Sequence, residues 1–274
     1  MWNRKQDRKQ DRKLTSVTLA LAAVGLATSV AAQAAPATAG TADPQQPTVV
    51  IVHGAFADGS DWARVIPLLQ AKGVKVQAVQ NGLESLAGDV AATRRAIDNQ
   101  PGKVVLVGHS WGGTVITEAG ASDKVSALVY VAAFAPEAGQ STEEAGKAFP
   151  PAPGIGKLVA DKDGYLSLPP QAVASDFAQD VPAARARVMA ATQGPIQAKA
   201  FGEKTSVAAW SSRPSWYIVS ANDRMIPPDL ERAMAKRIGA RVTTLPTSHV
   251  PQQSRPADVA KVILDAVQTV KAQN

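Results

Sequence analysis

The stretch Lys103–Gly113 (KVVLVGHSWGG) decides the fold. Its first five residues form an apolar, β-branched run, which is typical of a strand buried on both faces. A helical pattern follows over Thr114–Ala121. Gly-x-Ser-x-Gly between a buried strand and a helix indicates a sharp turn that lifts a serine hydroxyl above the sheet, and the two flanking glycines avoid a collision with neighbouring backbone. The pattern predicts that Ser110 is a nucleophile.

The same alternation of strand and helix extends on both sides of this turn and predicts an α/β fold with a mostly parallel, doubly wound sheet. Further strands are expected at Thr48–Val52, Val74–Val79, Val125–Ala133, Ser215–Ser220 and Arg241–Leu245. Further helices are expected at Asp61–Lys72, Leu86–Gln100, Pro228–Ile238 and about Pro256–Lys271.

The alternation of strands and helices is interrupted between about residues 135 and 212. This segment is rich in Pro and Ala and has helical patterns near Pro170–Ala178 and Pro182–Ala191. We interpret this insertion as a helical cap over the carboxyl edge of the sheet, where ligands bind in such folds. A surface excursion without a role is the alternative. The whole domain is expected to span residues 48–271.

The amino-terminal 34 residues resemble an export signal. A basic stretch, Arg4–Lys13, precedes the apolar run Val17–Ala32, and Ala32-Gln33-Ala34 fits a small-x-small cleavage site. We predict a signal peptide at 1–34, a flexible linker at 35–47, and an exported protein with no stable membrane insertion after cleavage. The apolar run is short for a membrane span; an uncleaved anchor is the alternative.

Composition narrows the classes of function. Among 274 residues, 45% are hydrophobic, which excludes a disordered chain, and the absence of cysteine excludes disulfides and thiol catalysis. Most of the net charge of +6 lies in the leader, and the body contains no basic run. We therefore expect no nucleic-acid partner.

A serine nucleophile needs a base and an acid that orients the base. Of the three histidines, His109 adjoins the nucleophile and His53 ends the first strand, so His249, in the loop after the last strand, is the predicted base. Asp223 follows the strand Ser215–Ser220 directly and is the predicted acid, with Asp229 as runner-up. His53 is expected to bind loop backbone instead.

The oxyanion of an acyl-transfer intermediate needs two backbone donors. We predict the amides of Trp111 and Ala55, with Phe56 as second choice for the latter. Phe56 and Phe134 are candidate substrate contacts. Further apolar pocket walls are expected from Trp111, Phe149, Leu158, Phe177 and Phe201, although aromatic residues in such places are as often ordinary core.

From Thr48 to Lys271 the chain resembles the α/β-hydrolase superfamily. His53–Phe56, Gly59–Trp62 and Gly108–Gly113 are similar to segments of small serine carboxylesterases, a group with plant methyl-ester hydrolases, hydroxynitrile lyases and bacterial pyrethroid-hydrolase-type esterases. The resemblance implies a triad of Ser110, Asp223 and His249. Val250 stands where the plant lyases have a lysine after the histidine, which disfavours cyanohydrin cleavage.

These observations predict a serine hydrolase that cleaves carboxylic esters of small to medium apolar molecules through an acyl-enzyme on Ser110. Two alternatives remain: a ligand-binding or weakly active protein of the same fold, and a cofactor-free lyase or perhydrolase that uses the same triad. No nucleotide, flavin or metal motif occurs in the sequence, so we expect no cofactor and no metal.

Overall fold

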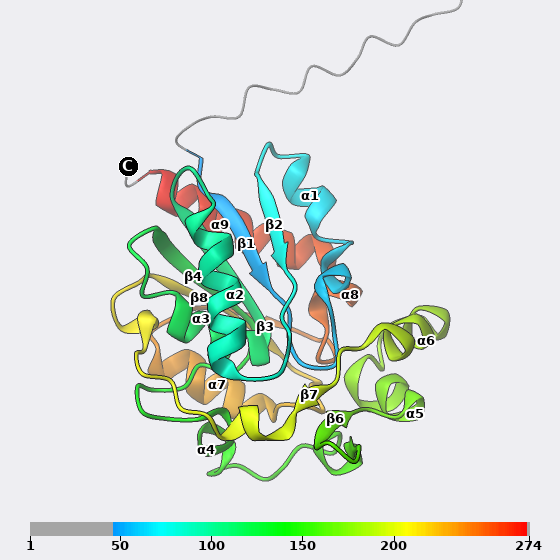
Figure 1. Cartoon of the computed structure of the whole chain (residues 1–274). Helices are drawn as coiled ribbons and strands as arrows, with labels where there is room; N and C mark the ends of the chain where they lie inside the picture. Colours follow the sequence, from blue (N-terminus) through cyan, green and yellow to red (C-terminus); the bar gives the residue numbers. More distant parts are fainter. Residues whose placement is uncertain (1–45, 273–274) are drawn as a thin grey trace, which may run out of the picture. The chain divides into compact units, whose positions relative to one another are not determined.

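A computed structural model describes residues 46–272, which form a parallel six-stranded sheet flanked by helices (Figure 1). The strands are β1 (Thr48–Val52), β2 (Val76–Val79), β3 (Val104–Ser110), β4 (Val125–Ala133), β8 (Ser215–Ser220) and β9 (Arg241–Leu245). Their spatial order is β2-β1-β3-β4-β8-β9, and every neighbouring pair is parallel. The predicted fold class is confirmed. The predicted signal peptide and residues 35–45 of the predicted linker lie outside the described residues.

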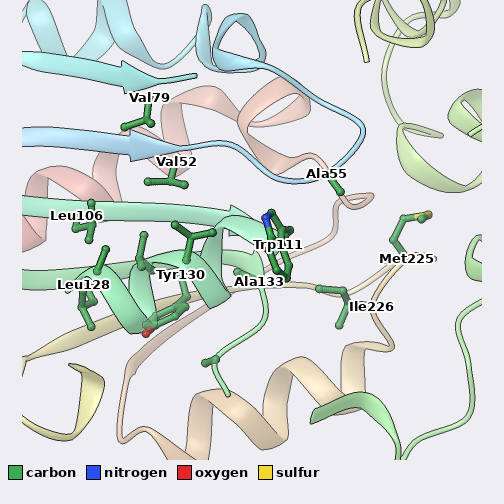
Figure 2. Packing of buried hydrophobic residues seen from close by; sticks show 14 of the residues in the cluster. Val52, Ala55, Val79, Leu106, Trp111, Leu128, Tyr130, Ala133, Met225 and Ile226 are labelled. Atoms are coloured by element: carbon green, nitrogen blue, oxygen red, sulfur yellow. The ribbon is translucent and has the colours of Figure 1, made fainter. Parts of the chain in front are cut away.

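Alternate residues of each strand enter two separate hydrophobic clusters, one on each face of the sheet. Val50, Leu106 and Tyr130 face α2 (Leu86–Asp98), α3 (Trp111–Ala119) and α7 (Pro228–Arg237). Val49, Val105 and Val129 face α1 (Ile66–Gln70) and α9 (Pro256–Lys271). Figure 1 shows α2 and α3 in front of the sheet and α9 behind it, and Figure 2 shows part of the first cluster. Burial on both faces explains why the strands are apolar throughout.

One predicted helix is wrong in its extent. Instead of a single helix over Asp61–Lys72, the chain forms a 3₁₀ turn, η1 (Gly59–Trp62), and then the short α1. The Asp58 side chain accepts from the amide of Ser60 and begins the turn early. Proline near the start of α1 cannot donate to the preceding turn, so the two pieces remain separate.

The strand order reverses at β1, because β2 lies on one side of it and β3 on the other. In open parallel sheets the crevice beyond the carboxyl ends of such strands is the usual place for a ligand. Here that crevice is bordered by the loop after β1, which begins at His53, and by Ser110 at the end of β3.

The cap connects β4 to β8 and lies beyond the arrowheads of β1 and β2 in Figure 1. Its helical elements are α4 (Thr142–Gly146), η2 (Ile155–Lys157), α5 (Pro170–Ala172), the π-helical η3 (Val173–Phe177), α6 (Ala183–Thr192), η4 (Ala198–Gly202) and η5 (Ala209–Ser211). It also contains an unpredicted antiparallel sheet of β5 (Val159–Ala160), β6 (Tyr165–Ser167) and β7 (Ile196–Gln197). Strands of two or three residues are too short to show an alternating pattern.

Candidate active site

The turn from β3 into α3 holds Ser110 in a left-handed backbone conformation, with φ 52° and ψ −120°. A non-glycine residue adopts such angles only where its surroundings enforce them. A Cβ atom on Gly112 would lie 2.4 Å from the carbonyl oxygen of Val52, and one on Gly108 would lie 2.5 Å from that of Gly112. Both positions therefore require glycine, as the sequence pattern predicts.

The loops after β8 and β9 bring Asp223 and His249 together. His249 Nδ1 lies 2.5 Å from Asp223 Oδ2, and both side chains are buried. Asp223 Oδ1 accepts from the amides of Met225 at 2.6 Å and Ile226 at 2.8 Å. Because a carboxylate can only accept, Nδ1 carries the proton and Nε2 of His249 is left with a free lone pair.

The runner-up acid lies elsewhere. The Asp229 side chain is 84% exposed and is paired with Arg232 on its own helix. Asp229 contacts no histidine among the described residues and is therefore not paired with His249, the predicted base. Its place near the start of α7 is the usual setting for an aspartate at a helix amino terminus.

Ser110 and His249 line the same cavity, of about 490 Å³, between the strand ends and the cap. Within residues 46–272 no hydrogen-bond partner is found for Ser110 Oγ, and Ser110 is among the residues that line the cavity. Catalytic hydrogen bonds are often long in unliganded enzymes and tighten when the substrate binds.

The predicted oxyanion donors flank Ser110. Trp111 is the first residue of α3, where helix amides have no acceptor within the helix. Ala55 lines the cavity, and its amide forms no hydrogen bond to any described residue. The amide of Phe56, the second choice, instead donates to the carbonyl of Gly194 at 3.1 Å. Figure 2 shows Ala55 on the loop after β1 and Trp111 beside the end of β3.

The cavity walls are largely apolar. Phe56 and Phe134 line it from the strand ends, as the sequence predicts, and Phe149, Leu158, Leu166 and Phe201 line it from the cap. Polar groups enter the lining at α4, where Thr142, Glu143 and Lys147 are found. The arrangement suits an apolar ligand with a polar portion near α4.

Two aromatic rings expected in the walls lie elsewhere. The Trp111 ring is fully buried, and its Nε1 donates to Asp89 Oδ2 at 2.8 Å. The Phe177 ring packs against the imidazole of His249, with ring centroids 5.2 Å apart. Neither ring lines the cavity, because both turn into the core. The sequence pattern predicts which segment lies near the site, but it does not predict which rotamer a side chain adopts.

The two remaining histidines hold loops. His53 Nε2 accepts from the amide of Asn81 at 2.9 Å and its Nδ1 lies 2.8 Å from the carbonyl of Gly54, so the predicted structural role is confirmed. His109 Nε2 lies 2.8 Å from the backbone carbonyl of His249. Burial lowers the pKa of both rings, and that of His109 falls well below its ordinary value. A neutral His109 thus donates to the backbone carbonyl of His249, a contact that sequence reasoning missed.

Two further carboxylates, those of Asp61 and Asp180, accept hydrogen bonds from residues next to His249 in the sequence. Buried Asp61 accepts from Gln252 Nε2 at 2.5 Å and from Gln253 Nε2 at 2.9 Å. Burial raises the pKa of Asp61. From the cap, Asp180 Oδ2 accepts from the amide of Ser248 at 2.9 Å. Nothing in the sequence pairs residues so far apart, so these contacts could not be predicted.

In the part of the chain from 46 to 272, no cluster of three or more His, Asp or Glu side chains is arranged to hold a metal ion. None of the helices in that range is long and apolar enough to cross a membrane.

Comparison with known proteins identifies the class to which this fold and site belong. The model of the alpha/beta hydrolase family matches residues 49–262, and the chain therefore belongs to that family. A pyrethroid hydrolase from Sphingobium wenxiniae is 27% identical over 246 residues, which cover 79% of this chain and 86% of that protein. Methylesterase 2 from Arabidopsis thaliana is 36% identical over 108 residues, which cover 32% of this chain and 40% of that protein.

Solved structures show the same fold. A variant of the pyrethroid hydrolase PytH superposes with a TM-score of 0.73 at 23% identity, covering 82% of this chain and 98% of that one. A variant of polyneuridine aldehyde esterase superposes with a TM-score of 0.70 at 22% identity, covering 81% and 99%. These likenesses extend over the cap as well as the sheet, since the matched 81–82% of this chain is nearly the whole of residues 46–272.

Proposed function

We propose that the protein is a serine hydrolase that cleaves carboxylic esters of small to medium apolar molecules. The observation that carries the proposal is the buried Asp223–His249 pair at 2.5 Å beside the cavity onto which Ser110 opens. The chain is similar to a relative named as a methylesterase and to a structural neighbour named as an esterase, which supports the same reaction.

In the proposed reaction, His249 Nε2 takes the proton of Ser110 as Oγ attacks the ester carbonyl carbon. The amides of Ala55 and Trp111 donate to the oxyanion that forms, and each such donor typically contributes about 3 kcal/mol. His249 then returns the proton to the leaving alcohol, and the acyl group remains on Ser110. Water, activated by His249, releases the acid, while Asp223 holds the Nδ1–H tautomer throughout.

The apolar walls support an apolar acyl or alcohol group as the substrate class. Most of the cavity lining is apolar, and its charged side chains, Glu143 and Lys147, both lie at α4, so a charged group placed against the other walls would lose hydration without compensation. We also propose that the protein acts after export, on the basis of the basic and apolar pattern of residues 1–34.

Hydrolysis of p-nitrophenyl acetate by the wild type and by Ser110→Ala tests the reaction. We expect turnover by the wild type and a loss in kcat of about 10⁴-fold or more in the variant, because removal of a serine nucleophile leaves only binding and the oxyanion donors. Equal rates for the two proteins would contradict the hydrolase and favour the ligand-binding alternative.

A further inference from the structure

Glu231, in the first turn of α7, is fully buried next to Asp223, the carboxylate that pairs with His249. Its Oε2 accepts from the amide of Ser220 at 3.0 Å. Its Oε1 has no N–H or O–H donor among the described residues, and the neighbouring side chain is the carboxylate of Asp223. Two carboxylate groups that face each other in a buried site, with no donor between them, need a proton.

Among residues 46–272, no other side chain next to Glu231 offers it a hydrogen-bond donor or a positive charge that would replace the proton. The Tyr217 hydroxyl donates to the carbonyl of Ala133 and is therefore not available to Glu231. The Arg232 guanidinium points outward, half exposed, and pairs with Asp229. His249 is committed to Asp223 through Nδ1. Asp223, Tyr217 and Arg232 are the titratable groups that act on Glu231 from its surroundings.

Several effects act on the pKa of Glu231 in opposite directions, and those that raise it are the stronger. Burial and the adjacent charge of Asp223 raise the pKa of Glu231 well above its ordinary value, while the Ser220 amide and Arg232 act in the other direction without offsetting them. The amino terminus of α7 also favours a negative charge, but such an effect is modest compared with full desolvation of a carboxylate. Asp223 already receives His249 and two amides, so of the two acids it is the better stabilised as the anion.

We propose that Glu231 is a neutral acid that donates a hydrogen bond to the Asp223 carboxylate and thereby positions the acid of the triad. It touches neither substrate nor reacting atoms, so it is a positioning residue. The catalytic consequence rests on the proposed function, whereas the shared proton between the two carboxyl groups does not.

The variant Glu231→Gln tests the proposed proton on Glu231 by a measurement that does not depend on enzymatic activity. An amide can donate to Asp223 and accept from Ser220 but has no proton to lose. In the wild type, the stabilisation from Glu231 is complete below the unfolded-state pKa of about 4.5 and decreases as pH rises toward the higher folded-state pKa. The stability of Glu231→Gln relative to the wild type should therefore increase with pH above that point, by up to about tenfold in the unfolding equilibrium constant per pH unit.

Chemical denaturation between about pH 5 and about pH 9 measures this difference. The control is Asp229→Asn, the same change at an exposed position of the same helix, which should run parallel to the wild type. Infrared difference spectra should show the carbonyl band of a protonated carboxylic acid in the wild type and not in Glu231→Gln. Parallel stability curves for wild type and Glu231→Gln, with no such band, would overturn the proposal.

Ester hydrolysis by Glu231→Gln and Glu231→Leu tests the positioning role. Leucine has a similar size but donates nothing, so kcat should decrease about tenfold or more with little change in KM. Glutamine should retain most of the activity and lose the decline that deprotonation of Glu231 imposes on the wild type at alkaline pH. Leucine and glutamine variants with equal kcat would overturn the positioning role. A wild type that hydrolyses no ester but shows the infrared band would refute the proposed function alone.

Discussion

The loops after β8 and β9 and the cap meet at one cavity, but different kinds of contact hold them in place. Asp223 receives two backbone amides and the imidazole of His249, so its position is fixed by short-range geometry within buried surroundings. The cap presents mainly apolar side chains to the same cavity and is tied to the loops by a few polar contacts. We therefore propose that the chemistry resides in the loops and the substrate preference in the cap.

The largest loss of activity should come from a substitution of Asp223, the acid of the proposed triad. Asp223→Asn removes a charge that stabilises the imidazolium and presents an amide that can impose the wrong tautomer on His249, so kcat/KM should fall about 10³- to 10⁴-fold. Asp229→Asn, at the exposed runner-up position, should remain within about twofold of the wild type, because exposed ion pairs contribute little. Steady-state kinetics on a p-nitrophenyl ester compares the two. A similar loss in both variants would refute the assignment of the acid.

The side chains that the sequence predicts to meet in these loops are also ones that the structure brings together. Ser110 sits in a motif whose glycines are required by contacts within a few residues, so the information is local. Asp223 and His249 follow from a topological rule, since the carboxyl ends of parallel strands share one edge. Neither inference needs knowledge of how side chains pack.

What the sequence did not predict depends on packing between distant segments. Glu231 lies on a helix rich in charged residues, and only the docking of α7 against β8 buries it. The donation from His109 to the His249 carbonyl likewise depends on two loops that are brought together by the sheet. In the cap, strands of two or three residues carry too little pattern to distinguish them from loops.

An intermediate effect, on stability, is expected where the cap contacts the loop after β8, which carries Asp223. Buried Asp176 accepts from Arg224 Nε at 2.7 Å and pairs with Lys157. Burial alone would raise the pKa of Asp176, but the hydrogen bonds from Lys157, Ser175 and Arg224 outweigh it and lower the pKa to about 2. This stabilisation is present above the unfolded-state pKa of 3.8 and is lost as pH falls through about 2.

Asp176→Asn should therefore destabilise the protein by about 2 kcal/mol at neutral pH and by much less at low pH. Urea denaturation at several pH values measures the difference. Asp163→Asn is the matched control in the same cap, because that side chain is 61% exposed and pairs only with its neighbour Lys162. If Asp176→Asn were as stable as Asp163→Asn at neutral pH, the cap would be held by its apolar contacts alone.

The smallest effect should come from the cavity wall, and it tests whether the cap sets preference without altering the chemistry. Phe149→Ala removes a ring from the cap side of the cavity, where it lies far in sequence from every triad residue. Longer acyl chains should gain room, so the ratio of kcat/KM for p-nitrophenyl octanoate to that for the acetate should rise about 3- to 10-fold. Val188→Ala, at a cap position that is 60% exposed, should leave this ratio unchanged. A loss of activity toward both esters in Phe149→Ala would instead show that the cap also supports the geometry of the triad, and the division between the two regions would not hold.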